Sequence, residues 1–98
     1  MAAYLVVRVN VTDQNKFREY LKATPAIIAK HEGRYIARGG EMVTLEGQQE
    51  TRRIVIIEFP SLEKARQFYD SSEYQDARRL REGAAVGEII VVEGVKPA

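Results

Sequence analysis

Two side chains of this 98-residue chain are candidates for acid–base chemistry. His31 is its single histidine and therefore the one side chain whose ordinary pKa lies near neutrality. Glu58 lies near the end of the apolar run RIVIIEF, and a carboxylate in an apolar cleft can acquire a raised pKa and act as a base. For His31 two interpretations stay open: a catalytic group or haem ligand, or a ring that ends a helix, where a cation complements the macrodipole.

A second set of candidates can hold an anionic or oxygen-bearing molecule, because arginine pairs with carboxylates and tyrosine offers an aromatic face and a hydroxyl. The candidate ligand-binding residues are Arg8, Arg34, Arg38, Tyr69, Tyr74 and Arg78. Each also has a structural interpretation. The tyrosines can pack in the core, and Arg78 can form a solvated salt bridge. Arg38 precedes two glycines and can end a strand at a bulge, paired with Glu93 or with an acid of a partner chain.

The composition argues against several other functions. The chain has no cysteine and no recognisable spacing of metal ligands, so we expect no metal site. It also lacks the glycine motifs that bind phosphates or dinucleotides, and we expect no cofactor. Fifteen Lys and Arg against fourteen Asp and Glu favour neither nucleic acid nor a membrane surface as a partner. Without a basic leader or a long apolar run, we expect a cytoplasmic protein.

Clusters of β-branched residues predict four strands, at 4–11, 34–38, 53–59 and 88–94. A short extended segment is expected at 42–47. With a helix in each half, the order of elements is βαββαβ. Two such units with right-handed crossovers give a ferredoxin-like α+β sandwich, in which a four-stranded antiparallel sheet carries both helices on one face. The length fits a single domain with a core at about 3–95.

Capping residues mark the ends of the predicted helices. Thr12 is the expected N-cap of the first helix, and Gly33 its end. At Pro25 either the helix kinks or Thr24 caps a second segment with Pro25 at its first position, and we favour a continuous helix with a kink. Ser61 is expected to cap the second helix, after which SEYQ at 72–75 has the form of a capping box that opens a further segment.

Side chains alternate along a strand, which divides the predicted sheet into two faces. The set without charge is assigned to the helices: Leu5, Val7, Val9, Tyr35, Ala37, Val55, Ile57, Phe59, Ile90 and Val92. The other face has charged ends and an apolar middle: Val6, Ile36, Ile54, Ile56, Ile89 and Val91. Because such an apolar patch is rarely left in water, we expect a second copy to cover it in a two-fold homodimer.

The charged ends of that second face suggest two functions. Treating the first and third strands as parallel neighbours places Arg8 beside Glu58, where it would oppose a raised carboxylate pKa, and Arg34 near the same end. Arg38 would lie at the other end. These polar groups could frame a cleft for a small anionic or oxygenated organic molecule, in a binding module or a small enzyme. Alternatively, the face is used entirely for packing in a non-catalytic homodimer.

Four stretches together resemble the domain of unknown function 1330 family, in the dimeric α/β-barrel superfamily. These are AYLVVRVNVTD, KHEGRYIARGGE, IVIIEFPSLEKARQFYDSSEYQDARRLR and VVEGV. The resemblance implies a ferredoxin-like fold and a dimer, and it supplies no reaction. The wider superfamily includes small monooxygenases, muconolactone isomerases and haem-binding dismutases, but no catalytic motif of theirs is found in this chain.

Overall fold

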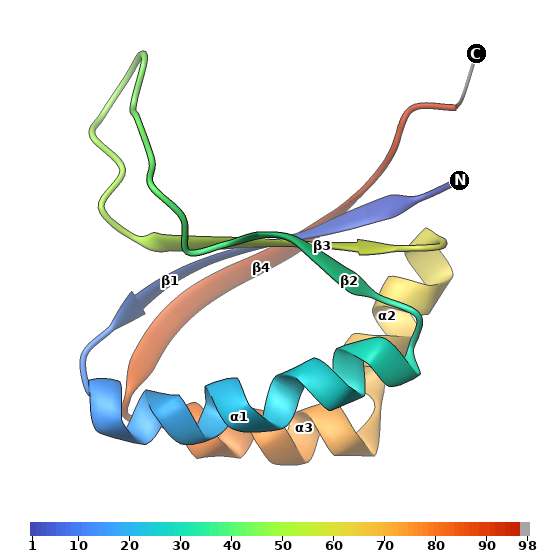
Figure 1. Ribbon diagram of the computed structural model, residues 1–98, viewed down its shortest axis with the longest axis horizontal. Helices are drawn as coiled ribbons and strands as arrows, with labels where there is room; N and C mark the ends of the chain where they lie inside the picture. The colour runs from blue at the N-terminus through green and yellow to red at the C-terminus, as the bar shows by residue number, and fades with distance from the viewer. Residues whose placement is uncertain (97–98) are drawn as a thin grey trace.

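The computed structural model describes residues 1–96, in which one antiparallel sheet carries the helices on one face (Figure 1). Along the chain the elements are β1 (Ala3–Val11), α1 (Gln14–Lys30), β2 (Arg34–Arg38), β3 (Arg53–Phe59), α2 (Leu62–Asp70), α3 (Ser72–Arg78), a 3-10 turn (Arg79–Arg81) and β4 (Ala85–Glu93). The strand order is β2-β3-β1-β4, and each neighbouring pair is antiparallel. The predicted ferredoxin-like arrangement is confirmed.

The segment between β2 and β3 differs from its prediction. Residues 39–52 contain no strand, although an extended segment was expected at 42–47. The chain leaves the sheet at Gly39, whose φ is +67°, and rises as a long loop on the side of the sheet opposite the helices (Figure 1). Leu45 in this loop is 92% exposed. The last backbone contact with β3 before the loop is the hydrogen bond from Gly39 N–H to the carbonyl oxygen of Ile54, at 2.9 Å.

Helix α1 begins one residue later than predicted. The Asp13 side chain, and not that of Thr12, accepts a hydrogen bond from the backbone N–H of Lys16, at 3.1 Å. Asp13 lies outside the helical conformation and so is free to cap the first turn. The helix then runs through Pro25 to Lys30, so the expected continuity is confirmed, while the expected kink stays a prediction.

The end of α1 depends on two residues. Glu32 takes the left-handed conformation, with φ of +64°, in place of the expected glycine. Gly33 is needed for space instead: a Cβ atom there would lie 2.7 Å from the ring of Phe59 and 2.8 Å from Ile28. This close approach brings the start of β2 against the core.

The second helical half follows the predicted caps with a shift of one residue. Ser61 caps α2, as expected. Ser71, not Ser72, caps α3, and its hydroxyl accepts from the N–H of Tyr74 at 3.1 Å. Gly83, with φ of +75°, turns the chain into β4.

The sheet register corrects two predictions about the faces. Strands β1 and β3 are antiparallel, so Tyr4 lies opposite Glu58, and the predicted contact between Arg8 and Glu58 is wrong. In β4, Val91 lies opposite Leu5. Ile89 and Val91 therefore face the helices, and Ile90 and Val92 face outward, the reverse of the prediction.

A β-bulge changes the face of the last residues of β2. Tyr35 lies opposite Ile57, but Ala37 lies opposite Ile56, so Ile36 is an extra residue on this strand. Beyond the bulge Arg38 lies opposite Val55, whose side chain faces the helices. The predictions that Arg38 projects from the outer face and that Ala37 faces the helices are therefore wrong.

The core lies between the sheet and the helices, as expected. Its buried residues are Leu5, Ile28, Ile57, Phe59, Ala65, Phe68 and Tyr74. The outer face keeps its predicted apolar middle with a changed membership: Val6, Ile36, Ile54, Ile56, Ile90 and Val92. None of the helices in residues 1–96 is both long and apolar enough to cross a bilayer.

The cap of α1 gives a first test of the structure. We expect Asp13→Ala to lower the free energy of unfolding by about 1 kcal/mol, because it removes the acceptor for an unpaired helix N–H. Thr12→Ala is the control and should change stability by less than about 0.5 kcal/mol. Urea unfolding followed by circular dichroism measures both. An equal loss for the two variants would contradict the assignment of the cap.

Candidate functional site

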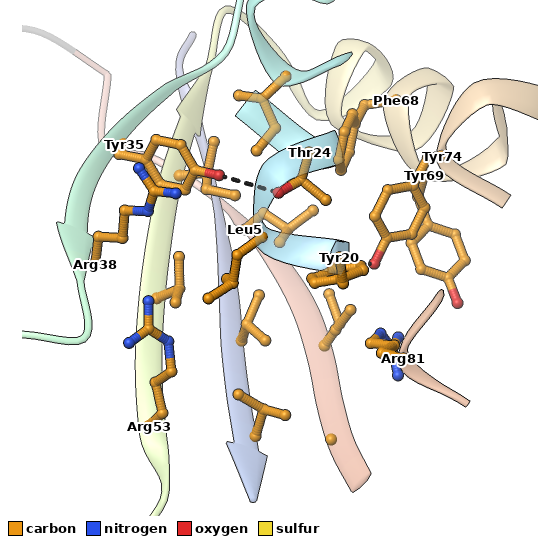
Figure 2. Close-up of a pocket in the computed structure, with 18 of the residues that line it drawn as sticks. Leu5, Tyr20, Thr24, Tyr35, Arg38, Arg53, Phe68, Tyr69, Tyr74 and Arg81 are labelled. Atoms are coloured by element: carbon orange, nitrogen blue, oxygen red, sulfur yellow. Dashed lines mark hydrogen bonds between the residues drawn. The ribbon is translucent and has the colours of Figure 1, made fainter. Parts of the chain in front are cut away.

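A cavity of about 50 Å³ lies between the sheet and helix α1, opening from the core of the fold (Figure 2). Space of this size holds more than one water molecule but is smaller than an aromatic ring needs, so a larger ligand enters only if side chains of the wall move aside. Most of its wall is apolar, formed by the inward residues of β1, β3 and β4 and by one stripe of α1. Its polar side chains are Tyr20, Thr24, Tyr35, Arg38, Arg53, Tyr69, Tyr74 and Arg81.

Arg38 enters the cavity wall from β2 because of the bulge. Its guanidinium carbon lies 4.3 Å from the centre of the Tyr35 ring, a cation–π contact that fixes the side chain along the edge of the sheet. The Tyr35 hydroxyl points in turn to Thr24 of α1, at 3.5 Å (Figure 2). Within residues 1–96 Arg38 forms no ion pair with a carboxylate.

Arg53, at the start of β3, is the second cation on this side of the cavity (Figure 2). It lies opposite Val9 of β1, so its side chain points toward the helices. Its Nε atom is buried and has no hydrogen-bond partner among the described residues, and it forms no ion pair there. Leaving a buried donor unpaired costs about 1–3 kcal/mol, and more for a charged group, so an arriving acceptor would be favoured.

Gly39 makes room for this arginine. A Cβ atom at Gly39 would come within 2.2 Å of Nη1 and 2.7 Å of Cζ of Arg53. Gly39 also has a φ of +67°, which side chains other than glycine adopt at a cost. The glycine after Arg38 therefore serves both the turn and the placement of a second guanidinium.

A pair of tyrosine hydroxyls lies deeper in the cavity. The hydroxyls of Tyr20 and Tyr74 are 2.8 Å apart, and Tyr74 is 2% exposed. Burial, followed by the neighbouring Tyr74, raises the pKa of Tyr20 far above its ordinary value. Tyr20 therefore stays protonated, and one proton of the pair remains available for an acceptor.

Arg81, from the 3-10 turn after α3, lies on the far side of this pair. Its guanidinium carbon is 5.4 Å from the centre of the Tyr20 ring. Burial lowers the pKa of Arg81, but its interactions with the hydroxyls of Tyr74 and Tyr20 outweigh burial and raise that pKa above its ordinary value. The cavity thus has a third fixed positive charge.

The lining defines what the site can do chemically. Its ionisable groups are arginines and tyrosines, and its described wall contains no carboxylate, histidine, lysine or cysteine. The wall therefore offers positive charge, hydroxyl donors and apolar surface, but no group with an ordinary pKa near neutrality that would act as a base. No group of three potential metal ligands occurs in residues 1–96.

The structure separates the residues that the sequence nominated for ligand binding. Arg38, Tyr69 and Tyr74 line the cavity, and Arg78 lines a groove beside it. Arg8 and Arg34 lie on the outer face.

Each outer arginine has an acidic partner. Arg34 Nε is 2.6 Å from Glu58 Oε1, and Arg8 Nε is 3.7 Å from Glu50 Oε1. Hydrogen bonds from the Arg52 side chain hold the pKa of Glu50 to about 2, so this carboxylate is ionised at neutral pH.

The two acid–base candidates lie outside the cavity wall. The hydrogen bond from Arg34 lowers the pKa of Glu58, which is the opposite of what a general base needs. His31 caps α1: its Nδ1 is 2.9 Å from the carbonyl oxygen of Ile27, and its ring meets Phe68 edge-on at 5.9 Å. These contacts match the helix-end interpretation of the histidine.

Sequence reasoning missed five polar residues of the site: Tyr20, Thr24, Tyr35, Arg53 and Arg81. A signal existed for Arg53, because it shares the alternation of Val55 and Ile57 and so belongs to the inward set of β3. Tyr20 belongs to the apolar stripe of α1, where a packing role was the simplest interpretation. For Arg81 the sequence contains no signal, since the 3-10 turn alone directs it toward the helices.

The two adjacent glycines allow a matched test of the site's geometry. We expect Gly39→Ala to lower the free energy of unfolding by about 1–3 kcal/mol, because it strains the backbone and displaces Arg53. Gly40→Ala meets no atom within 4 Å and should be neutral or slightly stabilising. Urea unfolding compares them. Similar stabilities for both variants would contradict the close packing of Arg53 on Gly39.

Comparison with solved structures shows the same fold in several proteins. A protein of unknown function from Rhodopseudomonas palustris superposes with a TM-score of 0.77 at 19% identity, over 98% of this chain and 84% of that one. SnoaB from Streptomyces nogalater, a cofactor-independent oxygenase, superposes with a TM-score of 0.68 at 12% identity, over 98% and 95%. A dimeric protein of unknown function with a ferredoxin-like fold, from Bacteroides fragilis, gives 0.64 at 16% identity, over 95% and 96%.

Sequence comparison identifies the family. No curated protein matches the chain. The family model described as domain of unknown function DUF1330 matches residues 2–95, nearly the whole chain, which confirms the resemblance seen in its motifs. The chain belongs to the DUF1330 family.

Proposed function

We propose that this protein binds a small organic anion with an apolar body in the cavity between the sheet and α1. The observation that carries the proposal is the pair Arg38 and Arg53, which face an apolar cavity without a carboxylate partner in residues 1–96. A guanidinium with a buried, unpaired donor gains a charge-assisted hydrogen bond when a carboxylate, enolate or similar oxygen anion arrives.

The rest of the cavity wall matches the body of such a ligand. The rings of Phe17, Tyr20 and Phe68, together with the aliphatic side chains of β1, offer apolar contact around the two arginines. Small-molecule sites commonly combine an apolar wall with a few placed polar groups. The ligand's charge is therefore expected at Arg38 and Arg53, with its carbon skeleton toward the tyrosines.

If the protein is an enzyme, its residues act on the ligand by charge and hydrogen bonding. Arg38 and Arg53 would stabilise a negative oxygen, and the Tyr20–Tyr74 pair would donate a hydrogen bond to a second oxygen. A base would have to come from the substrate, because the described wall has none. SnoaB, a cofactor-independent oxygenase with the same fold, supports small-molecule chemistry on such a scaffold.

Isothermal titration calorimetry with benzoate tests this binding. We expect Arg53→Gln and Arg38→Gln each to weaken its affinity about tenfold or more, because each removes a charge-assisted hydrogen bond. Arg34→Gln is the matched control from the same strand as Arg38, and it should leave the affinity unchanged. Absence of benzoate binding by the folded protein, or an equal loss in all three variants, would contradict the proposal.

The outer face of the sheet supports a second proposal, which concerns assembly. Ile36, Ile90 and Val92 are 47%, 55% and 53% exposed there, and the loop bearing Leu45 rises on the same side (Figure 1). We propose that a second copy of the chain covers this face. Arg8 and Arg34 on this face are paired with acids of their own chain, so a second copy would not bury them as unpaired charges. The dimeric Bacteroides fragilis protein of the same fold supports this assembly.

A charge in the apolar face tests this assembly. We expect Ile90→Asp to convert a dimer into a monomer, because an unpaired carboxylate would be buried at the interface. Leu80→Asp is the control: Leu80 is 40% exposed but lies in the helical layer. Native mass spectrometry gives the subunit number. A wild-type monomer, or dissociation in both variants, would contradict the proposed interface.

A further inference from the structure

The positive charges of the cavity lie on two opposite sides of it. Arg38 and Arg53 come from the edge formed by β2 and β3, whereas Arg81 comes from the 3-10 turn beyond Tyr20 (Figure 2). The space between them is bounded by the side chains of β1 and by the aromatic residues of the helices. A ligand that is held by the first two arginines and spans this space would reach the third.

A more polar groove lies beside the cavity on the Arg81 side. Cavity and groove share five residues: Leu5, Tyr69, Arg81, Gly87 and Ile89. Gly87 of β4 has no side chain at this junction, while its neighbours on the inward face of the strand do. At this point β4 therefore places no side chain between the two spaces.

The groove carries further positive charge. Arg66 of α2 and Arg78 of α3 line it together with Arg81, and its one lining carboxylate is that of Asp70. Neither Arg66 nor Arg78 forms an ion pair within residues 1–96, and Arg78 reaches only the Gln75 side chain, at 3.4 Å. Three arginines against one aspartate leave the groove positive, like the side of the cavity formed by Arg38 and Arg53.

We infer that the ligand carries two acidic groups, one at each end of an apolar skeleton. The first is held by Arg38 and Arg53, and the second by Arg81 at the mouth of the groove, within reach of the hydroxyl pair Tyr20–Tyr74. This inference rests on the proposed function and adds the class of ligand: a dicarboxylate or an equivalent dianion. An apolar tail would leave Arg81 unpaired, whereas a second carboxylate would pair with it.

The test compares α,ω-dicarboxylates, from succinate to suberate, with monocarboxylates of the same carbon number. Affinities are measured by calorimetry. If both ends are positive, one dicarboxylate in the series binds at least about tenfold more tightly than its matched monocarboxylate. If the far end is merely apolar, the monocarboxylate binds better, because burying an unpaired carboxylate is costly.

Variants assign the second acidic group to a residue. Arg81→Gln should remove the advantage of the best dicarboxylate while leaving monocarboxylate affinity within about twofold, because the first arginine pair is intact. Arg79→Gln is the control: this neighbouring arginine is 75% exposed, pairs with Asp76 at 3.7 Å and does not line the cavity. Thermal melting of each variant checks that it folds. If Arg81→Gln does not fold, Arg81→Lys, which keeps the positive charge, is used in its place.

The outcomes separate the two proposals. Monocarboxylates that bind through Arg38 and Arg53 with no gain from a second carboxylate would overturn the dianion and keep the proposed site. A dicarboxylate advantage that survives Arg81→Gln would also overturn it. Failure of every carboxylate to bind the folded protein would overturn the site itself.

Discussion

The β-bulge in β2 determines the electrostatics of the cavity. One extra residue, Ile36, shifts the alternation of the strand, so that Arg38 lies opposite Val55 and faces the helices. There it stacks on Tyr35, while Gly39, which follows, turns the chain and leaves space for Arg53. Without the bulge Arg38 would project from the outer face, and the cavity would lose one of its two unpaired cations on that side.

The arginines on the two faces of the sheet have different kinds of partners. On the outer face Arg8 and Arg34 have carboxylate partners in the same chain. On the inward face Arg38, Arg53 and Arg81 have aromatic rings and hydroxyls as neighbours, with no ion pair in residues 1–96. Among them Arg53 has a buried donor without a partner, which costs stability that a bound anion would recover, whereas Arg38 is exposed. This contrast is the physical basis for placing the ligand inside the fold and a second copy outside it.

Local patterns in the sequence were enough to predict the fold, but not which side chains of each strand face the helices. The capping residues and β-branched runs predict the order of the elements and most of their bounds to within a residue or two, although β4 begins at Ala85, three residues before its predicted start. The run EIIVVE of β4 is symmetric, so alternation cannot decide which side faces the helices; its pairing with Leu5 of β1 does. The bulge at Ile36 likewise depends on pairing with β3, and no local pattern reveals it. Arg53 was predictable from its alternation with Val55 and was overlooked.

The most direct test of the central claim is the NMR signal of the Arg53 Nε–H group during titration with benzoate. That donor is buried and unpaired in the described structure, so a bound carboxylate should give it its first strong acceptor. We predict a downfield shift of its proton that saturates with ligand, while the Arg34 Nε–H signal, already bonded to Glu58, stays in place. Saturable binding with no change at Arg53 would contradict the account.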